Sequence, residues 1–227
     1  MGQPIAHSRK CVALMSLYWN TAAEKMESVL RSVSAALSGT DFYLAGGTAL
    51  ALLEGHRVSV DLDLFSRTFD DPEAAQMRLQ EAHPDAATTS ISPRTLYMQV
   101  KGTTVSLFGY SYPLVAPLLR PDSSILPLAS REDIVAMKLA AIASRGSRKD
   151  FIDLWLLTTR YWPLAECLEL YRKKFAARDI GHVVRSLTYF DDADDEPPLR
   201  LLIDVDWEEI KRDLVGGVKG LLKTENS

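Results

Sequence analysis

The sequence has little of several features that mark common classes of protein. Only two of its 227 residues are cysteines, Cys11 and Cys167, and they lack the spacing of metal ligands, so we expect two free thiols in a reducing compartment. No apolar run approaches the length of a membrane span, and the first residues contain no signal-peptide core. These absences predict a cytoplasmic protein with no membrane partner.

Hydrolase chemistry and a global attraction for nucleic acid are also without support. No serine or cysteine nucleophile motif occurs, and the four histidines are too scattered for a catalytic dyad or a zinc site: His7, His56, His83 and His182. The formal net charge of -4 gives no overall positive field, so residues that bind RNA would have to be local. With 47% hydrophobic residues, the chain can form one large domain or two small ones.

A pair of glycines, Gly46 and Gly47, stands between a short apolar run at residues 42–45 and a predicted helix at 48–54 that Gly55 ends. Glycine lets the backbone approach a ligand closely, and a helix N-terminus attracts anions. The pattern therefore predicts a phosphate-binding turn. A tight turn with Thr48 as an ordinary helix cap is the alternative.

Two aspartates share one face of a strand predicted over residues 58–65. Apolar and polar residues alternate there, with Val58, Val60, Leu62 and Leu64 facing the core and Ser59, Asp61 and Asp63 facing the other way. In an extended strand the Cα atoms of the aspartates lie about 6.5–7 Å apart, so both carboxylates can reach one cation. Because like charges on one strand face repel, we favour a divalent metal over a solvated pair.

The remainder of the chain predicts a sheet followed by helices. Strands near residues 87–91, 95–100 and 103–108 complete the sheet, and four prolines at residues 110–127 mark a crossing segment. We place the domain boundary there, giving a core at 1–127 and a helical domain at 128–227. The acidic stretch at 191–196 is expected to be a solvated loop, since it lacks the pattern of a calcium site.

Charged residues gather around the junction of two predicted helices, 132–145 and the one after Ser147. Lys138 stands among apolar residues, and Asp150 and Asp153 share a helix face. Taken alone, Lys138 fits a snorkelling surface lysine, and the two aspartates beside Arg145 and Arg148 fit a salt-bridged helix start. A phosphate-binding lysine is the alternative.

Three stretches together resemble the AbiEii/AbiGii toxin family, whose members have a minimal nucleotidyltransferase fold. They are LAGGTALAL at residues 44–52, GHRVSVDLDLF at 55–65, and Lys138 followed by RGSRKDFID at 145–153. They lie in the family's order and span roughly residues 42–157. The resemblance implies an α/β fold, with a polymerase-β-like mixed sheet, flanking helices and a C-terminal helical bundle.

The resemblance also implies an activity, a site and partners. The activity is Mg²⁺-dependent transfer of a nucleotidyl group from an NTP to an acceptor, which in characterised relatives can be the 3′ end of tRNA, under control of an antitoxin. Asp61 and Asp63 would hold the metal, and Lys138 would contact the triphosphate. Asp150, ranked above Asp153, would position Lys138 or act as a third carboxylate. The nucleotide would be held by the other residues of the motifs: Gly46, Gly47, Thr48, Arg57, Ser59, Arg145 and Arg148. For Arg57, pairing with an aspartate or with a phosphate stays open.

The sequence departs from many nucleotidyltransferases on the strand at 103–108, where a third carboxylate is commonly found. This strand offers only hydroxyls, and Ser106 is the nearest polar candidate. The number of metals and the general base therefore stay open. So do two other functions, namely a nucleotidyltransferase acting on a small molecule or protein, and a catalytically silent binding module.

Overall fold

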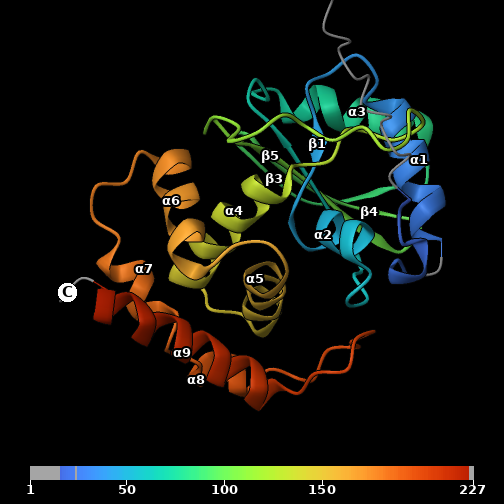
Figure 1. The fold of residues 1–227 in the computed structure, drawn as a ribbon. Helices are drawn as coiled ribbons and strands as arrows, with labels where there is room; N and C mark the ends of the chain where they lie inside the picture. The colour runs from blue at the N-terminus through green and yellow to red at the C-terminus, as the bar shows by residue number, and fades with distance from the viewer. Residues whose placement is uncertain (1–15, 24, 225–227) are drawn as a thin grey trace, which may run out of the picture.

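The computed structural model describes residues 16–23 and 25–224, so His7 and Cys11 lie outside the described part. The chain forms a half built on a β-sheet and a half built from helices (Figure 1). A 3-10 turn, Trp19–Thr21, precedes α1 (Met26–Ala36), α2 (Gly46–Glu54) and α3 (Pro72–Ala82) in the sheet half. Cys167 is a buried free thiol, as the sequence predicts.

The mixed sheet has five strands in the order β1-β2-β5-β4-β3. Their bounds are β1 Tyr43–Leu44, β2 Asp61–Ser66, β3 Ala87–Ser92, β4 Thr95–Val100 and β5 Thr103–Gly109. β2 runs parallel to β5 and antiparallel to β1. Along β2 the apolar residues Leu62 and Leu64 are fully buried, whereas Asp61 and Asp63 are only partly so. The sheet thus has one core face and one face that carries the two carboxylates.

The strand predicted from residue 58 begins only at Asp61, and Val60 is not a core residue but 57% exposed. The preceding backbone pairs with distant segments. The Val58 N–H donates to the carbonyl of Arg200, and the Ser59 N–H donates to the carbonyl of Thr21. The alternation of apolar and polar residues in the sequence therefore begins before the first residue of the strand.

The helical half contains α4 (Arg131–Ser144), α5 (Arg148–Arg160), α6 (Leu164–Phe175), α7 (Gly181–Ser186), α8 (Asp191–Asp194) and α9 (Trp207–Thr224). The side chain of Ser130 caps α4, and Gly146, at φ +60°, makes the break between α4 and α5. Before α9 the chain reaches back to the sheet half, where Leu201 forms a β-bridge with Arg57 (Figure 1).

The acidic stretch at 191–196 is partly helical and not the loop that the sequence suggests, although most of its acids are exposed to solvent as expected. Its first residues form α8, and the Glu196 carboxylate accepts the Arg148 N–H at the start of α5. The Asp194 carboxylate lies 3.0 Å from Nζ of Lys211 on α9. Glu196 therefore caps α5, and Asp194 forms an ion pair with α9.

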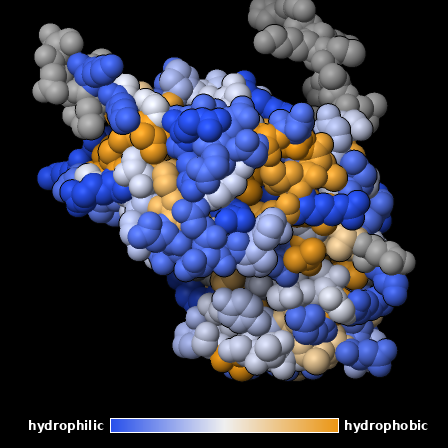
Figure 2. Space-filling view, turned by 90° about the horizontal axis from the view of Figure 1, so that it is seen from below, coloured by the Kyte–Doolittle hydropathy of each residue, from blue (hydrophilic) through white to orange (hydrophobic). Residues whose placement is uncertain are grey.

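The buried side chains form one hydrophobic cluster that continues across the predicted boundary at residue 127. On the face seen in Figure 2, hydrophobic residues form patches separated by hydrophilic ones. Among the described residues, no helix has the length and apolar character needed to cross a membrane.

A buried ion pair joins α4 to α6 and provides a first test of the fold. Nζ of Lys174 lies 2.7 Å from Oδ1 of Asp133, and both side chains are fully buried. We expect Lys174→Met to lower the free energy of unfolding by about 3–5 kcal/mol, because it leaves a buried carboxylate without its cation. Chemical denaturation measures this. The control Lys219→Met, at an exposed position of α9, should change stability by less than about 0.5 kcal/mol, and an equally small effect of Lys174→Met would contradict the pairing.

Candidate active site

A cavity of about 690 Å³ opens where the two halves meet, and most of the predicted site residues line it. The sheet half contributes the glycine turn, the segment before β2 and the carboxylate face of the sheet. The helical half contributes α4, the start of α5 and the segment before α9. The predicted site residues on its wall are Gly46, Gly47, Arg57, Ser59, Asp61, Asp63, Lys138, Arg145 and Asp150.

The glycine turn places the N-terminus of α2 at this cavity. The helix begins at Gly46, two residues earlier than the sequence suggests, and Gly46 has a φ of +65°. Ala45 is the N-cap and its side chain makes no capping bond. The first N–H groups of a helix have no partner within it and carry the positive end of the helix dipole. This end of α2 can therefore accept an anion.

Thr48 neither caps α2 nor lines the cavity. It lies inside α2, is buried, and its hydroxyl hydrogen-bonds with Oγ of Ser59 at 2.8 Å and with the carbonyl of Asp61. Ser59 is buried as well and lines the cavity. Both hydroxyls thus fix the backbone that leads into β2.

Asp61 and Asp63 project from β2 toward the cavity, with Ser106 of β5 opposite Asp63. Burial and the neighbouring Asp61 carboxylate raise the pKa of Asp63, although the positive charges of Lys149 and Lys138 and a hydrogen bond from Ser106 act against this shift. Burial and the Asp61 carboxylate together therefore disfavour the charged form of Asp63 more than the surrounding cations and Ser106 favour it.

These residues fit a divalent cation of the kind that hard oxygen ligands bind. Two carboxylates on one strand face supply oxygen donors, and the pKa of Asp63 is raised despite the nearby cations Lys149 and Lys138. Among the described residues, no group of three or more His, Cys, Asp or Glu side chains is arranged to hold a metal. A third carboxylate is thus missing from the described site, and Asp150 does not replace it.

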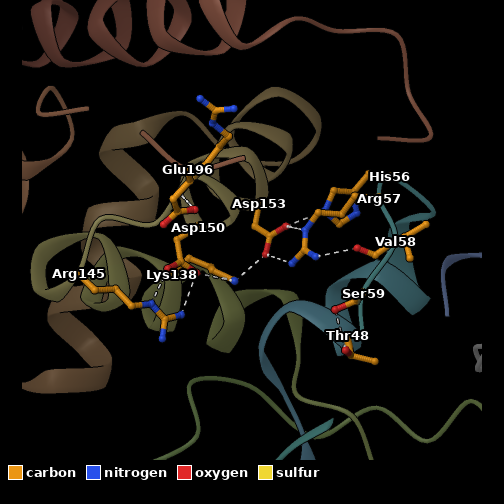
Figure 3. Close-up of polar contacts among 11 residues, drawn as sticks. Thr48, His56, Arg57, Val58, Ser59, Lys138, Arg145, Asp150, Asp153 and Glu196 are labelled. Atoms are coloured by element: carbon orange, nitrogen blue, oxygen red, sulfur yellow. Dashed lines mark hydrogen bonds and ion pairs between the residues drawn. The ribbon is translucent and has the colours of Figure 1, made fainter. Parts of the chain in front are cut away.

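Asp153, which the sequence analysis ranked below Asp150, is the centre of a buried charge network (Figure 3). Its Oδ1 lies 2.7 Å from both Nε2 of His56 and Nε of Arg57. Its Oδ2 lies 2.8 Å from Nη2 of Arg57 and 2.6 Å from Nζ of Lys138. Burial alone would raise the pKa of Asp153, but the Arg57 and Lys138 cations hold it well below its usual value. Arg57 therefore pairs with an aspartate, one that does not belong to the strand pair.

Asp150 continues this network toward the mouth of the cavity. Its carboxylate lies 2.8 Å from Nζ of Lys138 and 2.9 Å from Nε of Arg145. Burial opposes ionisation, yet these two cations lower the pKa of Asp150. The Lys138 ammonium is buried, and its pKa is nevertheless raised by Asp153 and Asp150. Asp150 and Asp153 thus position a charged Lys138 at the cavity wall, while the Arg145 side chain stays 57% exposed.

Arg148 lies apart from the other predicted residues. Its guanidinium donates to the carbonyls of Ala193 and Asp194 and stacks on the ring of Trp207 at 5.1 Å. It joins α5 to the segment around α8, and we leave it out of the site.

Several residues that line the cavity were not predicted from the sequence. Lys149 and Arg200 add cations to the wall, and Phe65, Phe108 and Tyr110 add aromatic rings. Phe65 had a usable signal, since it follows Asp61 and Asp63 with the same period of two. Arg200 had none, because its position depends on a pairing with Val58 across a long stretch of sequence.

Comparisons with known proteins agree with this architecture. The model of the family "Nucleotidyl transferase AbiEii toxin, Type IV TA system" matches residues 28–104 and 105–220. An uncharacterized protein of Aquifex aeolicus (strain VF5) is 35% identical over 206 residues, which cover 88% of this chain and 97% of that protein.

Solved structures show the same fold. JHP933 from Helicobacter pylori superposes with a TM-score of 0.53 at 21% identity, covering 88% of this chain and 93% of its own. The nucleotidyltransferase toxin MenT4 from Mycobacterium tuberculosis H37Rv superposes with a TM-score of 0.54 at 17% identity, covering 85% and 82%.

The mixed sheet with flanking helices and a helical C-terminal half defines a nucleotidyltransferase fold, as the sequence predicts. Because the family model covers most of the chain, the protein belongs to the AbiEii family of nucleotidyl transferase toxins. The family resemblance seen in the sequence is thereby confirmed, and the protein is a nucleotidyltransferase. Membership implies an NTP as substrate and an antitoxin as partner.

The charge network predicts a large effect of removing one carboxylate. Asp153→Asn should lower the free energy of unfolding by about 3–5 kcal/mol, because Arg57 and Lys138 lose a buried counter-charge. Since the folded-state pKa of Asp153 is lowered, its contribution is fully present above the ordinary carboxyl pKa of 3.8 and is lost as the pH falls below it. Denaturation at several pH values tests both points, with exposed Asp204→Asn as control. A penalty that disappears at mildly acidic pH would contradict this assignment.

The close approach of Gly47 to Arg57 predicts a defect of activity. A Cβ added at Gly47 would lie 2.2 Å from Nη2 of Arg57, so Gly47→Ala must displace the guanidinium or the helix N-terminus. We expect a loss of transfer rate of about a hundredfold, the cost of a misplacement of about 1 Å. The control is Gly216→Ala on α9, where an added Cβ meets nothing within 4 Å; it should keep full activity. Wild-type activity in folded Gly47→Ala would contradict a need for this packing.

Proposed function

We propose that this protein uses Mg²⁺ to transfer a nucleotidyl group from an NTP to the 3′ hydroxyl of tRNA, as a toxin held in check by an antitoxin. One observation carries the proposal. The carboxylates of Asp61 and Asp63 share a cavity with the N-terminus of α2 and with cations from both halves. A triphosphate with its metal is complementary to this arrangement of charge.

The N–H groups at Gly46 and Gly47 suit the β- and γ-phosphates, because they point their positive dipoles at the cavity and have no side chain to block the approach. Asp61 and Asp63 would hold the magnesium ion. When bound, the ion supplies charge neutralisation and Lewis acidity at the phosphoryl oxygens. The acceptor hydroxyl then attacks the α-phosphorus, a new P–O bond replaces the one to the β-phosphate, and pyrophosphate and the hydroxyl proton leave.

Lys138 and Arg145 suit the stabilisation of the charge that develops on the leaving pyrophosphate. An ammonium group has three N–H donors. Lys138 directs one of them to Asp150 and forms an ion pair with Asp153. The remaining donor can reach a phosphate oxygen while the two aspartates keep the side chain in place. Such preorganised charges need no rearrangement during the reaction.

A transfer assay tests the proposal. Purified protein is incubated with Mg²⁺, each α-labelled NTP in turn and total tRNA, and the label is followed on a denaturing gel. We expect label on tRNA from the wild type and a loss of about a thousandfold in Asp63→Asn, equivalent to the several kcal/mol that a bound metal ion contributes. The exposed control Asp70→Asn should behave as wild type.

The assay has two outcomes that would overturn parts of the proposal. Label that moves to a protein or small molecule, and never to RNA, would reject tRNA as the acceptor while keeping the transfer chemistry. A wild-type protein that binds no NTP in the presence of Mg²⁺ would reject the transfer itself and favour a binding module.

A further inference from the structure

A row of aromatic rings lies on the sheet face that carries the carboxylates and continues past the C-terminal end of β5. We call Tyr97, Phe108, Phe65, Tyr110 and Tyr112 the aromatic strip. In this order the neighbouring ring centroids lie 5.6, 5.2, 5.3 and 5.0 Å apart. The strip is therefore continuous and much longer than one ring.

The middle of the strip lies beside the proposed metal ligands. Phe65 follows Asp63 by two residues on β2, so both project from the same face of the sheet. Across the sheet Phe65 pairs with Phe108, and Ser106 pairs with Tyr97. Phe65, Phe108 and Tyr110 line the cavity itself. A group that reacts at the carboxylates would thus have these rings as its nearest apolar surface.

Both ends of the strip are open to solvent. Tyr97 is 36% exposed and Tyr112 is 47% exposed. Beneath Tyr97 and Phe108, β4 and β5 bury Leu96, Met98, Val105 and Leu107 on the opposite face. The sheet therefore has a complete core on one side and offers aromatic rings on the other.

Tyr110, next to one end of the strip, is held in place by a buried charge. The Lys174 ammonium lies 5.3 Å from the Tyr110 ring centroid and 2.7 Å from Oδ1 of Asp133. A ring held by a fixed cation loses little freedom when a second ring stacks beside it. Tyr110 is thus a preorganised contact surface.

We propose that the aromatic strip binds the unpaired bases at the 3′ end of an RNA acceptor. This inference rests on the proposed function and adds the way in which the acceptor is recognised. Every base has a π-face, so unpaired bases stack on aromatic side chains whatever their sequence. The strip continues beyond what the single base of an NTP can cover. The cations Arg145, Lys149 and Arg200 line the same cavity and suit the phosphates between the bases.

The strip requires single-stranded bases, which gives a binding test that needs no catalysis. A fluorescent RNA hairpin with a single-stranded 3′ overhang is compared with the same hairpin with a blunt end, by fluorescence anisotropy without NTP. Wild type should prefer the overhang by tenfold or more. Tyr112→Ala and Tyr97→Ala should each weaken overhang binding by about fivefold to a hundredfold, the range measured for loss of one stacking ring.

Two control variants separate stacking from other effects. Tyr112→Phe keeps the aromatic ring on which a base stacks, so it should bind the overhang within about twofold of wild type. Tyr189→Ala removes a tyrosine that is equally exposed but lies outside the strip, and should bind as wild type. Both mutated strip residues are partly exposed, so the alanine variants are expected to fold, which thermal denaturation checks.

Equal binding of overhang and blunt RNA by the wild type, or wild-type binding of the overhang by both alanine variants, would overturn the inference. Its failure is distinguishable from failure of the proposed function. Label transfer to tRNA that is unchanged in both alanine variants would leave the proposed function standing and reject the strip. Preference for the overhang without any transfer would support the strip and reject the chemistry. A strip that instead binds a protein partner would give no preference for overhang over blunt RNA.

Discussion

The buried carboxylate of Asp153 is the contact on which the active site depends. It takes Arg57 from the segment before β2 and Lys138 from α4, so one side chain ties the sheet half to the helical half. Because both cations are paired there, Arg57 can pack against Gly47 and Lys138 can extend to Asp150. One network of buried, charged side chains thus sets the position of the α2 N-terminus relative to Lys138 at the cavity wall.

Four aspartates at this cavity fall into two pairs with opposite electrostatics. Asp150 and Asp153 are surrounded by cations that lower their pKa, so their charge is satisfied within the protein. Asp61 and Asp63 lie side by side on one face of β2, and burial together with the Asp61 charge raises the pKa of Asp63. The charges of the first pair stabilise the structure through ion pairs, whereas the second pair suits the binding of a cation. Residue type alone does not distinguish these roles, but the surrounding charges do.

The sequence predicted those parts of the site that local chemistry determines. The glycine turn, the alternation that aligns Asp61 with Asp63, and the break at Gly146 all depend on neighbouring residues, and the structure contains each of them. Long-range pairing determined the rest. Val58 pairs with Arg200 and not with the sheet, and Arg148 turns to Ala193 and Asp194. The ranking of Asp150 above Asp153 failed to anticipate the network for the same reason, since His56 and Arg57 are remote in sequence.

Ser106 connects the chemistry of the carboxylates to the open face of the sheet. It stands opposite Asp63, on the neighbouring strand where a third carboxylate is common in other nucleotidyltransferases, and it contributes a hydrogen bond without a further negative charge. A third carboxylate there would increase the repulsion that already raises the pKa of Asp63. Without it, the acceptor hydroxyl has no charged group on β5 to orient it. The surface next to Ser106 is aromatic, with Tyr97 opposite it on β4 and Phe108 two residues further along β5. In our proposal these rings orient the acceptor by stacking, in place of a charge on β5.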